Sequence, residues 1–367
     1  MKSKVKRCTK RQMNSIEEQI LWIRLALSKK IGPITFWKIL SKSKNNIYNA
    51  CKLVENLATE DVAEKELSKH KKHGFSILLA KDAAFPQKLL NLKDCPPLLS
   101  VVGNLELLNK PTIAIVGARN ASLAGKSFAA KFAKNLGLNG FTTVSGMARG
   151  IDGAAHCGSM ETGSIAVLAG GVDVIYPQEN TDIYENLKKH GVIVSEMPIG
   201  TVVDATLFPR RNRIIAGLAQ GIVLIEAAEQ SGSLITAKYA LENNIEIFAV
   251  PGSPLDSRSR GCNNLIKQGA TLVDSADDVL SYMGIAIKHV EAVNKQKNDQ
   301  CYQRNETDHC SELKESILAE ISHTPIPIDS LFQTQDCSLS RLLTLLTELE
   351  HDGKVLRHVN NYVSLAD

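Results

Sequence analysis

The chain has 367 residues, of which 44% are hydrophobic and 22% charged, and its formal net charge is +4. This length suggests two or three domains with a sizeable core, and the composition is that of an ordinary soluble protein. A membrane-spanning helix is excluded because no window reaches about eighteen uninterrupted apolar residues. The eight cysteines form no CxxC pair and follow no secretory signal, so we expect reduced thiols in a cytoplasmic protein.

The charge is distributed unevenly along the chain. Residues 1–75 carry 17 Lys and Arg against 7 Asp and Glu, whereas residues 310–367 carry 4 against 9. A basic first segment favours a polyanionic partner. Composition and patterning together predict four parts: a basic N-terminal helical domain (1–74), an α/β domain (75–287), a polar linker (288–309) and a C-terminal domain (310–367).

The N-terminal part begins with a charged tail, residues 1–13, which we expect to be disordered. An apolar helical pattern starts at Ser15, and a Gly32-Pro33 turn separates it from a second periodic segment, Phe36–Leu40. Helix, turn and helix in this order form a helix-hairpin-helix unit, whose turn amides can contact a phosphate. The alternative is a small helical bundle that packs on the next domain.

The stretch from residue 111 to 156 organises the α/β domain. The apolar run Thr112–Val116 predicts a buried strand, and Ser122 is placed to cap a helix over about Leu123–Leu138. A second short strand, Phe141–Val144, leads into another glycine turn and another helix. Strand, glycine turn and helix, repeated, indicate the start of a parallel α/β sheet.

Similar strands recur through the domain, each followed by Gly, Ser or Arg. The remaining predicted strands are Phe75–Leu79, Leu98–Val102, Ser164–Leu168, Val192–Ser195, Gly221–Ile225 and Ile245–Val250. This alternation with helices predicts an open, doubly wound sheet, in which ligands bind at the carboxyl ends of the strands. Free amides and the helix dipole make such turns good phosphate sites, and two of the turns carry an arginine, Arg119 and Arg149.

The segment Leu207–Gly217 contains three arginines in four residues, Arg210, Arg211 and Arg213, before an apolar run that we expect to begin a helix. One interpretation is a solvated charge cluster that caps this helix. The other is a nucleic-acid contact, because Phe208 could offer a ring for a base and stacking beside arginines suits single strands.

Six ordered motifs, IVGARNAS, SGMARGIDGAAH, GGVDVIYP, FPRRNRIIAGL, EAAEQSGSLITA and GCNNLIKQGA, resemble those of the DNA-processing protein A family (DprA, also called Smf). The resemblance covers about residues 75–285. It implies an extended Rossmann-like sheet that binds single-stranded DNA as a homodimer, protects incoming or exposed single strands and helps load a RecA-type recombinase, as in natural transformation. We expect no cofactor.

The family's phosphate pocket and DNA-contacting loop, together with the other strand-end turns, give the predicted DNA site. It comprises Gly117, Arg119, Ser122, Ser145, Gly146, Arg149, Gly170, Gly171, Phe208, Arg211, Asn212, Arg213, Ser231, Gly232, Ser233 and Lys238. The chain departs from the family pattern at Arg149, where lysine is frequent, and at Asp204-Ala205, where the loop can carry a lysine. The second departure predicts a lower affinity.

The C-terminal part predicts a winged helix, which the resemblance also implies. Helices are expected near Leu313–Ile321, Ile328–Phe332 and Leu339–Glu350, followed by a two-stranded ribbon. Winged helices usually bind DNA, but the net charge of −5 here would repel phosphate. We therefore favour a role in protein contact or structure for this domain.

A rival function is a nucleotide-cleaving enzyme of the same Rossmann-like superfamily. Those enzymes carry a PGGxGTxxE turn with a catalytic glutamate, whereas this chain has QSGSLITAKYALE, with Lys238 near the place of the acid. Asp152 and His156 could suggest acid–base chemistry, but we interpret them as a helix cap and a structural hydrogen-bonder. Cys301, His309 and Cys310 lack a complete metal-ligand set, so no metal or catalytic residue is predicted.

Overall fold

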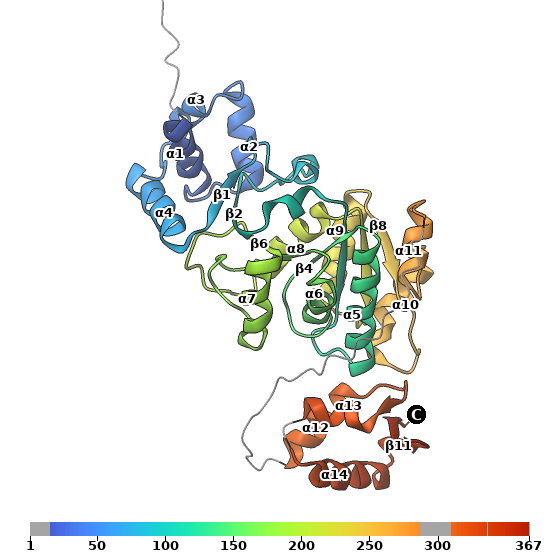
Figure 1. Cartoon of the computed structure of the whole chain (residues 1–367). Helices are drawn as coiled ribbons and strands as arrows, with labels where there is room; N and C mark the ends of the chain where they lie inside the picture. Colours follow the sequence, from blue (N-terminus) through green and yellow to red (C-terminus); the bar gives the residue numbers. More distant parts are fainter. Residues whose placement is uncertain (1–14, 287–309, 336, 367) are drawn as a thin grey trace, which may run out of the picture.

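The structure is a computed structural model, and it describes residues 15–286, 310–335 and 337–366. The predicted tail 1–13, the linker 288–309, and Cys301 and His309 lie outside the described residues. Figure 1 shows a helical part at the N-terminal end, a central α/β body and a small C-terminal domain below it. Within the described part, no helix is long and apolar enough to cross a membrane, and no cluster of three potential metal ligands occurs.

The N-terminal domain has four helices, and two tryptophans attach it to the body. The helices are α1 (Ser15–Ala26), α2 (Pro33–Lys42), α3 (Ile47–Lys52) and α4 (Glu60–His73). Trp22 Nε1 donates to the Pro97 carbonyl at 2.7 Å, and Trp37 Nε1 donates to the Cys95 carbonyl at 2.8 Å. Trp22 and Phe36 also belong to the same hydrophobic cluster as Leu99 of the body. These contacts fix α2 and its Gly32-Pro33 turn relative to the sheet.

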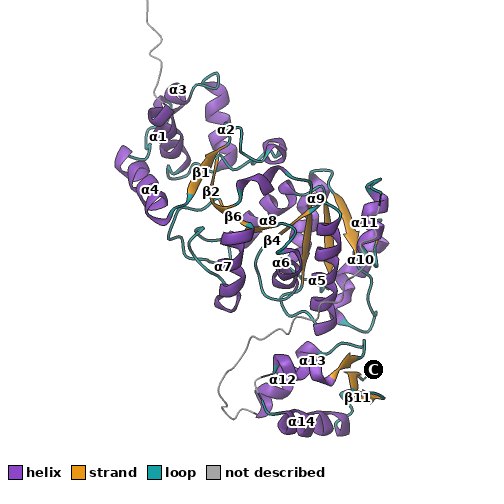
Figure 2. Cartoon of the chain, in the orientation of Figure 1, coloured by secondary structure: helices purple, strands orange, loops and turns teal. Residues whose placement is uncertain are grey.

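The body is built on one nine-stranded sheet (Figure 2). Its strands are β1 (Ser76–Leu79), β2 (Leu98–Gly103), β3 (Thr112–Gly117), β4 (Thr142–Ser145), β5 (Ser164–Val167), β6 (Val192–Ser195), β7 (Gly221–Ile225), β8 (Glu246–Ala249) and β9 (Thr271–Leu272), in the order β1-β2-β6-β5-β4-β3-β7-β8-β9. Strands β3 to β9 pair in parallel, and β1 and β2 add an antiparallel edge. The predicted doubly wound α/β sheet is therefore confirmed.

Helices cover both faces of this sheet: α5 (Leu123–Leu138), α6 (Ile151–Ser159), α7 (Thr181–His190), α8 (Leu207–Leu218), α9 (Ser233–Glu242), α10 (Arg260–Lys267) and α11 (Ala276–Tyr282). Alternate residues of β3 point to opposite faces. Ile113 belongs to the cluster under α5 and α11, whereas Ala114 belongs to the cluster that includes α8, α9 and the N-terminal helices. The body is thus three layers thick.

The structure tests the predicted starts of two helices of the body, α5 and α8. Helix α5 begins where predicted, because the Ser122 hydroxyl accepts a hydrogen bond from the Gly125 amide at 2.9 Å. Helix α8 begins earlier than predicted, at Leu207, so its arginines lie inside the helix and not before it. Pro209 is tolerated because it lies in the first turn, where its missing N–H costs nothing.

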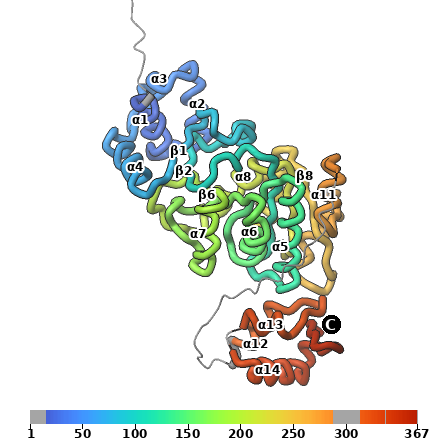
Figure 3. Tube along the Cα trace, in the orientation of Figure 1, coloured from blue at the N-terminus to red at the C-terminus, as the bar shows by residue number. Residues whose placement is uncertain are grey.

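The C-terminal domain is a winged helix with α12 (Cys310–Glu320), α13 (Ile328–Thr334), α14 (Leu339–His351), and strands β10 (Ile326–Pro327), β11 (Val355–His358) and β12 (Tyr362–Leu365). Strand β10 makes a third strand that the sequence did not predict. The domain contacts the body (Figure 3) through Arg258, whose guanidinium donates to the Ala319 and Ile321 carbonyls at 2.9 and 2.8 Å. Lys126 of α5 also pairs with Glu320 at 3.3 Å.

His156 is a fully buried histidine in the middle of the body. Its Nδ1 lies 2.8 Å from Ser164 Oγ, and its Nε2 has no partner among the described residues. Burial, helped by the Arg211 cation, lowers the pKa of His156 from 6.5 to about 3. The prediction that His156 has a structural role agrees with this environment.

We expect this histidine to make the protein acid-sensitive. Below pH 6.5 the unfolded chain protonates His156 but the folded chain does not until about pH 3, so the free energy of unfolding falls as pH falls through this window. Between pH 7 and pH 5 the loss from this residue is about 2 kcal/mol. Chemical denaturation at both pH values should show that His156→Gln loses about 2 kcal/mol less than wild type. The exposed His190→Gln is the matched control, and equal pH dependence of all three proteins would contradict the assignment.

Candidate nucleic-acid interface

Two arginine-bearing turns meet at the carboxyl edge of the sheet. The turn after β3 carries Arg119, and the turn after β4 carries Arg149. The Ile151 amide donates to the Ala118 carbonyl at 3.2 Å, and Gly150 has a left-handed φ of +74°. A Cβ at Gly150 would collide with the Ala118 and Arg119 carbonyls, so only glycine lets the two turns approach so closely.

The Arg211 guanidinium ties the first turn of α8 to two neighbouring strand ends. It is buried and donates to the Gly146 carbonyl and, at 2.6 Å, to the Val167 carbonyl. Burial lowers the pKa of Arg211 to about 10, while Asp152 acts in the opposite direction. A Cβ on Gly146 would overlap the guanidinium, which explains the glycine at that position.

Asp152 stabilises the turn after β4, whose Gly146 carbonyl accepts from Arg211, by binding the amides of that turn. Its carboxylate accepts hydrogen bonds from the Gly146 and Ala148 amides at 3.1 and 3.3 Å, and its pKa is raised because burial outweighs the nearby Arg211 cation. The residue that caps α6 is Gly150, so the prediction that Asp152 is the helix cap was wrong in detail. Asp152 instead holds the turn that precedes the helix.

The Phe208 ring lies between cations at this edge. The Arg119 guanidinium is 4.4 Å from its centroid, that of Arg211 is 6.0 Å away, and the Tyr176 ring is 5.8 Å away. A recess with a cavity volume of about 10 Å³ opens beside it and is lined by Gly146, Ala148, Gly170, Tyr176, Phe208 and Arg211. That volume holds about one water molecule, so a base or phosphate would rest on its rim.

The order of the strands reverses between β3 and β7, where open α/β sheets usually bind their ligand. Here the Glu226 carboxylate occupies that position. It accepts hydrogen bonds from the Ser122 amide at 2.8 Å and from the Ser122 hydroxyl, directly at the N-terminus of α5. Ser122 was predicted to contact phosphate, but an internal carboxylate takes its donors. This correction moves the candidate anion site away from α5.

Three further predicted site residues have structural roles here. The buried Ser145 hydroxyl donates to the Ile115 carbonyl at 2.6 Å. A Cβ on Gly117 would collide with the Ile225 carbonyl and the Ile151 side chain, and a Cβ on Gly171 would meet the Asp173 side chain and the Pro198 carbonyl. Internal packing and hydrogen bonding account for the residue types at these three positions.

The remaining predicted residues divide between two sides of α8. Asn212 Nδ2 donates to the Gly232 carbonyl at 3.3 Å, which links α8 to the half-exposed turn that carries Ser231 and Ser233. Lys238 is exposed on α9. Arg213 is buried and pairs with Glu196 at 2.5 Å and with Asp94 at 3.5 Å. It lies on the other side of α8 from the recess, so two residues of the predicted DNA site, Arg213 and Phe208, are not brought together in the structure.

Tyr176 and Glu226 belong to the site in the structure but are not among the predicted site residues. Tyr176 precedes the proline that ends the GGVDVIYP motif, and an aromatic residue in this position was a detectable signal; its ring is half-exposed in the structure. Glu226 follows the last residue of β7 with a left-handed φ of +49°, and nothing in the sequence placed it opposite Ser122.

Comparison with known proteins identifies the family. The model of the DNA recombination-mediator protein A family matches residues 76–284, and the DprA winged helix domain matches residues 304–361. Protein Smf of Escherichia coli is 35% identical over 292 residues, which is 78% of this chain and 77% of that protein.

Two solved structures are similar. DNA processing protein A from Streptococcus pneumoniae superposes with a TM-score of 0.63 at 33% identity, covering 73% of this chain and 98% of that one. DNA processing protein A from Helicobacter pylori, described for its single-stranded DNA binding mode, gives 0.53 at 27% identity and covers 57% and 95%. The predicted resemblance is confirmed: this chain belongs to the DNA recombination-mediator protein A (DprA/Smf) family.

Proposed function

We propose that this protein binds single-stranded DNA at the carboxyl edge of its sheet and helps load a RecA-type recombinase onto that DNA. The observation that carries the proposal is the Phe208 ring between the Arg119 and Arg211 cations. An aromatic platform beside cations suits single strands, because every base has a π-face and every nucleotide a phosphate. The Helicobacter pylori relative, which binds single-stranded DNA, supports the choice of ligand.

The role proposed for each arginine follows from how its guanidinium is held by internal contacts. Arg211 is held by two carbonyls, so it positions Phe208 and supplies a fixed positive potential. Arg149 is exposed and pairs with exposed Glu179 at 3.4 Å, a type of ion pair that contributes little to stability and can be exchanged for a phosphate. Arg119 covers one face of Phe208 and would shift to a phosphate when a base stacks there.

The proposal includes action in the cytoplasm as a homodimer and excludes catalysis. The strongest acid–base candidates, Asp152 and His156, are buried and hydrogen-bonded within the body. The rival nucleotide-cleaving activity would need a PGGxGTxxE turn, but the comparable segment, QSGSLITAKYALE, lacks the PGG and carries Lys238 near the place of the acid. A turnover assay on nucleoside monophosphates separates the two functions.

Removing either exposed arginine should weaken DNA binding. Arg119→Ala or Arg149→Ala should cost about 1.5–3 kcal/mol, which is about ten- to a hundredfold in affinity, because one charge-assisted phosphate contact is lost. Glu179→Gln should instead raise affinity, since it frees Arg149. Titrations of labelled oligothymidylate at fixed salt measure these changes. Lys134→Ala, an exposed charge on α5, is the control, and unchanged affinity in both arginine variants would refute the site.

Phe208→Ala should reduce affinity by about 1–3 kcal/mol while leaving the salt dependence nearly unchanged, because stacking involves no counterion release. Phe208→Tyr keeps a ring and should retain most of the affinity. A thermal melt recorded beside each isotherm distinguishes stacking from packing: a lower melting temperature with unaltered affinity would mean that the ring serves only the fold.

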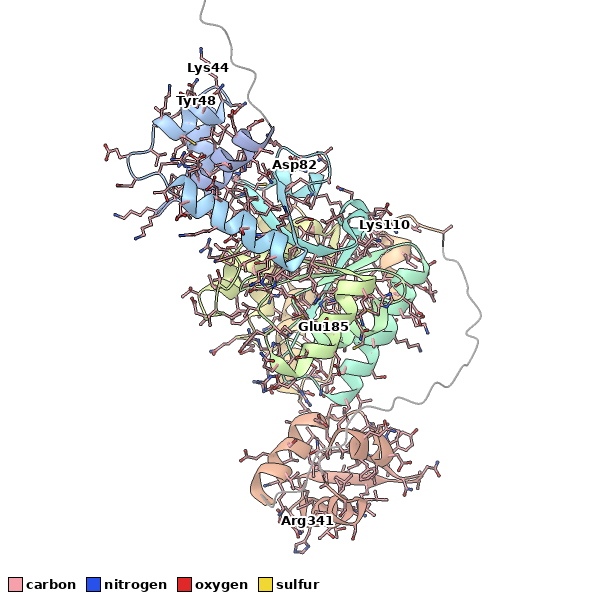
Figure 4. All side chains as sticks on the ribbon, turned by 60° about the vertical axis from the view of Figure 1, so that its left-hand side comes forward. Lys44, Tyr48, Asp82, Lys110, Glu185 and Arg341 are labelled. Atoms are coloured by element: carbon pink, nitrogen blue, oxygen red, sulfur yellow. The ribbon has the colours of Figure 1, made fainter. Side chains whose placement is uncertain are left out.

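Deleting the winged helix should change single-strand affinity by no more than about threefold. Its basic residues are few, and the acidic side chains of α14 pair with two of them: Lys314 with Glu348 at 2.8 Å and Arg357 with Glu350 at 3.6 Å. Arg341 lies at the end of the domain far from the body (Figure 4). The measurement compares full-length protein with a variant lacking residues 310–367. A large loss in a truncated protein that still melts cooperatively would show that the domain contacts DNA.

A further inference from the structure

The two sides of the first turns of α8 border two different depressions. Phe208 and Arg211, three residues apart and therefore on one side of the helix, line the small recess. Arg210 and Arg213, also three apart, line a larger cleft of about 340 Å³ between the N-terminal domain and the body. The other walls of this cleft are the α2 N-terminus, Asp94 and Tyr239. A cleft of this volume is in the range of small-molecule sites.

Of the two arginines that line the cleft, one is paired with carboxylates and the other can bind an anion. Arg213 is fixed by Asp94 and Glu196, so it forms part of the wall and offsets the Asp94 carboxylate. Arg210 is exposed and makes no ion pair within the described part of the chain. Its charge helps to lower the pKa of Asp204, but hydrogen bonds from Thr206 contribute most to that shift and Arg210 contributes least. Arg210 is therefore free to bind an anion.

The opposite wall offers donors to the same anion. Helix α2 starts at Pro33 with Gly32 as an N-cap that provides no side chain, so the Ile34 and Thr35 amides have no intrahelical acceptor. Thr35 adds an exposed hydroxyl, and the positive end of the helix dipole points into the cleft. The Trp37 hydrogen bond holds this helix against the body, and that of Trp22 holds the neighbouring α1, so the two walls are preorganised.

We propose that this cleft is a second nucleotide subsite for the same DNA strand, with its phosphate between Arg210 and the α2 N-terminus and its base against Tyr239. The inference rests on the proposed function. If one nucleotide of the strand lies at Phe208, the next subsite lies on the other side of α8, and the helix separates the two nucleotides. A mononucleotide unit fits the cleft's combination of one free cation, helix amides and a half-buried aromatic ring. This subsite would also give the Gly32-Pro33 turn a function in DNA binding, which the recess beside Phe208 does not provide.

A charge-matched pair of variants at Gly32 tests the subsite. Gly32 has a φ of −89°, and a Cβ there would meet nothing within 4 Å, so substitution is sterically tolerated. Asp and Asn both cap a helix well, so neither should unfold the protein, and they differ only in charge. On an oligothymidylate of about 20 nucleotides, Gly32→Asp should bind about tenfold more weakly than Gly32→Asn. Arg210→Ala should lower the salt slope by about 0.7, whereas the control Lys134→Ala should not.

The outcomes separate this inference from the proposed function. If wild type binds the oligonucleotide and Arg119→Ala weakens it, but both Gly32 variants bind as tightly as wild type and Arg210→Ala leaves the salt slope unchanged, the second subsite is refuted and the first stands. If wild type shows no single-strand binding, the proposed function itself fails. Free thymidine monophosphate is the last probe: saturable binding that Gly32→Asp abolishes without affecting the oligonucleotide would assign the cleft to a free nucleotide and overturn the strand assignment.

Discussion

The candidate site depends on one buried guanidinium. Arg211 bridges the carbonyls at the ends of β4 and β5 from the first turns of α8, and so fixes where that helix crosses the sheet edge. Phe208, one turn earlier, is thereby held over the edge, and Arg119 is placed against its ring. A buried cation is costly unless its donors are satisfied, and the two carbonyls and nearby Asp152 meet that requirement. Loss of Arg211 would disturb both fold and site.

The Glu226 carboxylate distinguishes this Rossmann-like sheet from one that binds a nucleotide at the same position. A helix N-terminus at the strand-order reversal normally receives a phosphate. In this protein the α5 N-terminus already holds an anion of its own, bound to Ser122. Added negative charge is therefore repelled at these amides, and the exposed cations lie beside them: Arg119 and Arg149 on the two turns and Arg210 on α8. The carboxyl edge of the sheet thus offers exposed cations to a DNA strand that would pass over it.

Local signals predicted much of the fold, and tertiary contacts decided the rest. The Ser122 cap and the apolar runs of β3 and β7 are encoded within a few residues, which is why those boundaries were found. The partner of Ser122 lies 104 residues away, and the burial of Arg211 depends on strand ends 44 and 65 residues away. Three arginines in four residues suggested either a solvated cluster or a DNA contact; only the packed sheet shows that Arg210 is exposed while Arg211 and Arg213 are buried.

A crystal structure with a short oligothymidylate bound tests the central claim most directly. The account predicts a phosphate in hydrogen-bond contact with the Arg119 or Arg149 guanidinium, a base stacked on Phe208, and Glu226 still bonded to Ser122. A phosphate on the Ser122–Gly125 amides, with Glu226 displaced and no base on Phe208, would contradict it.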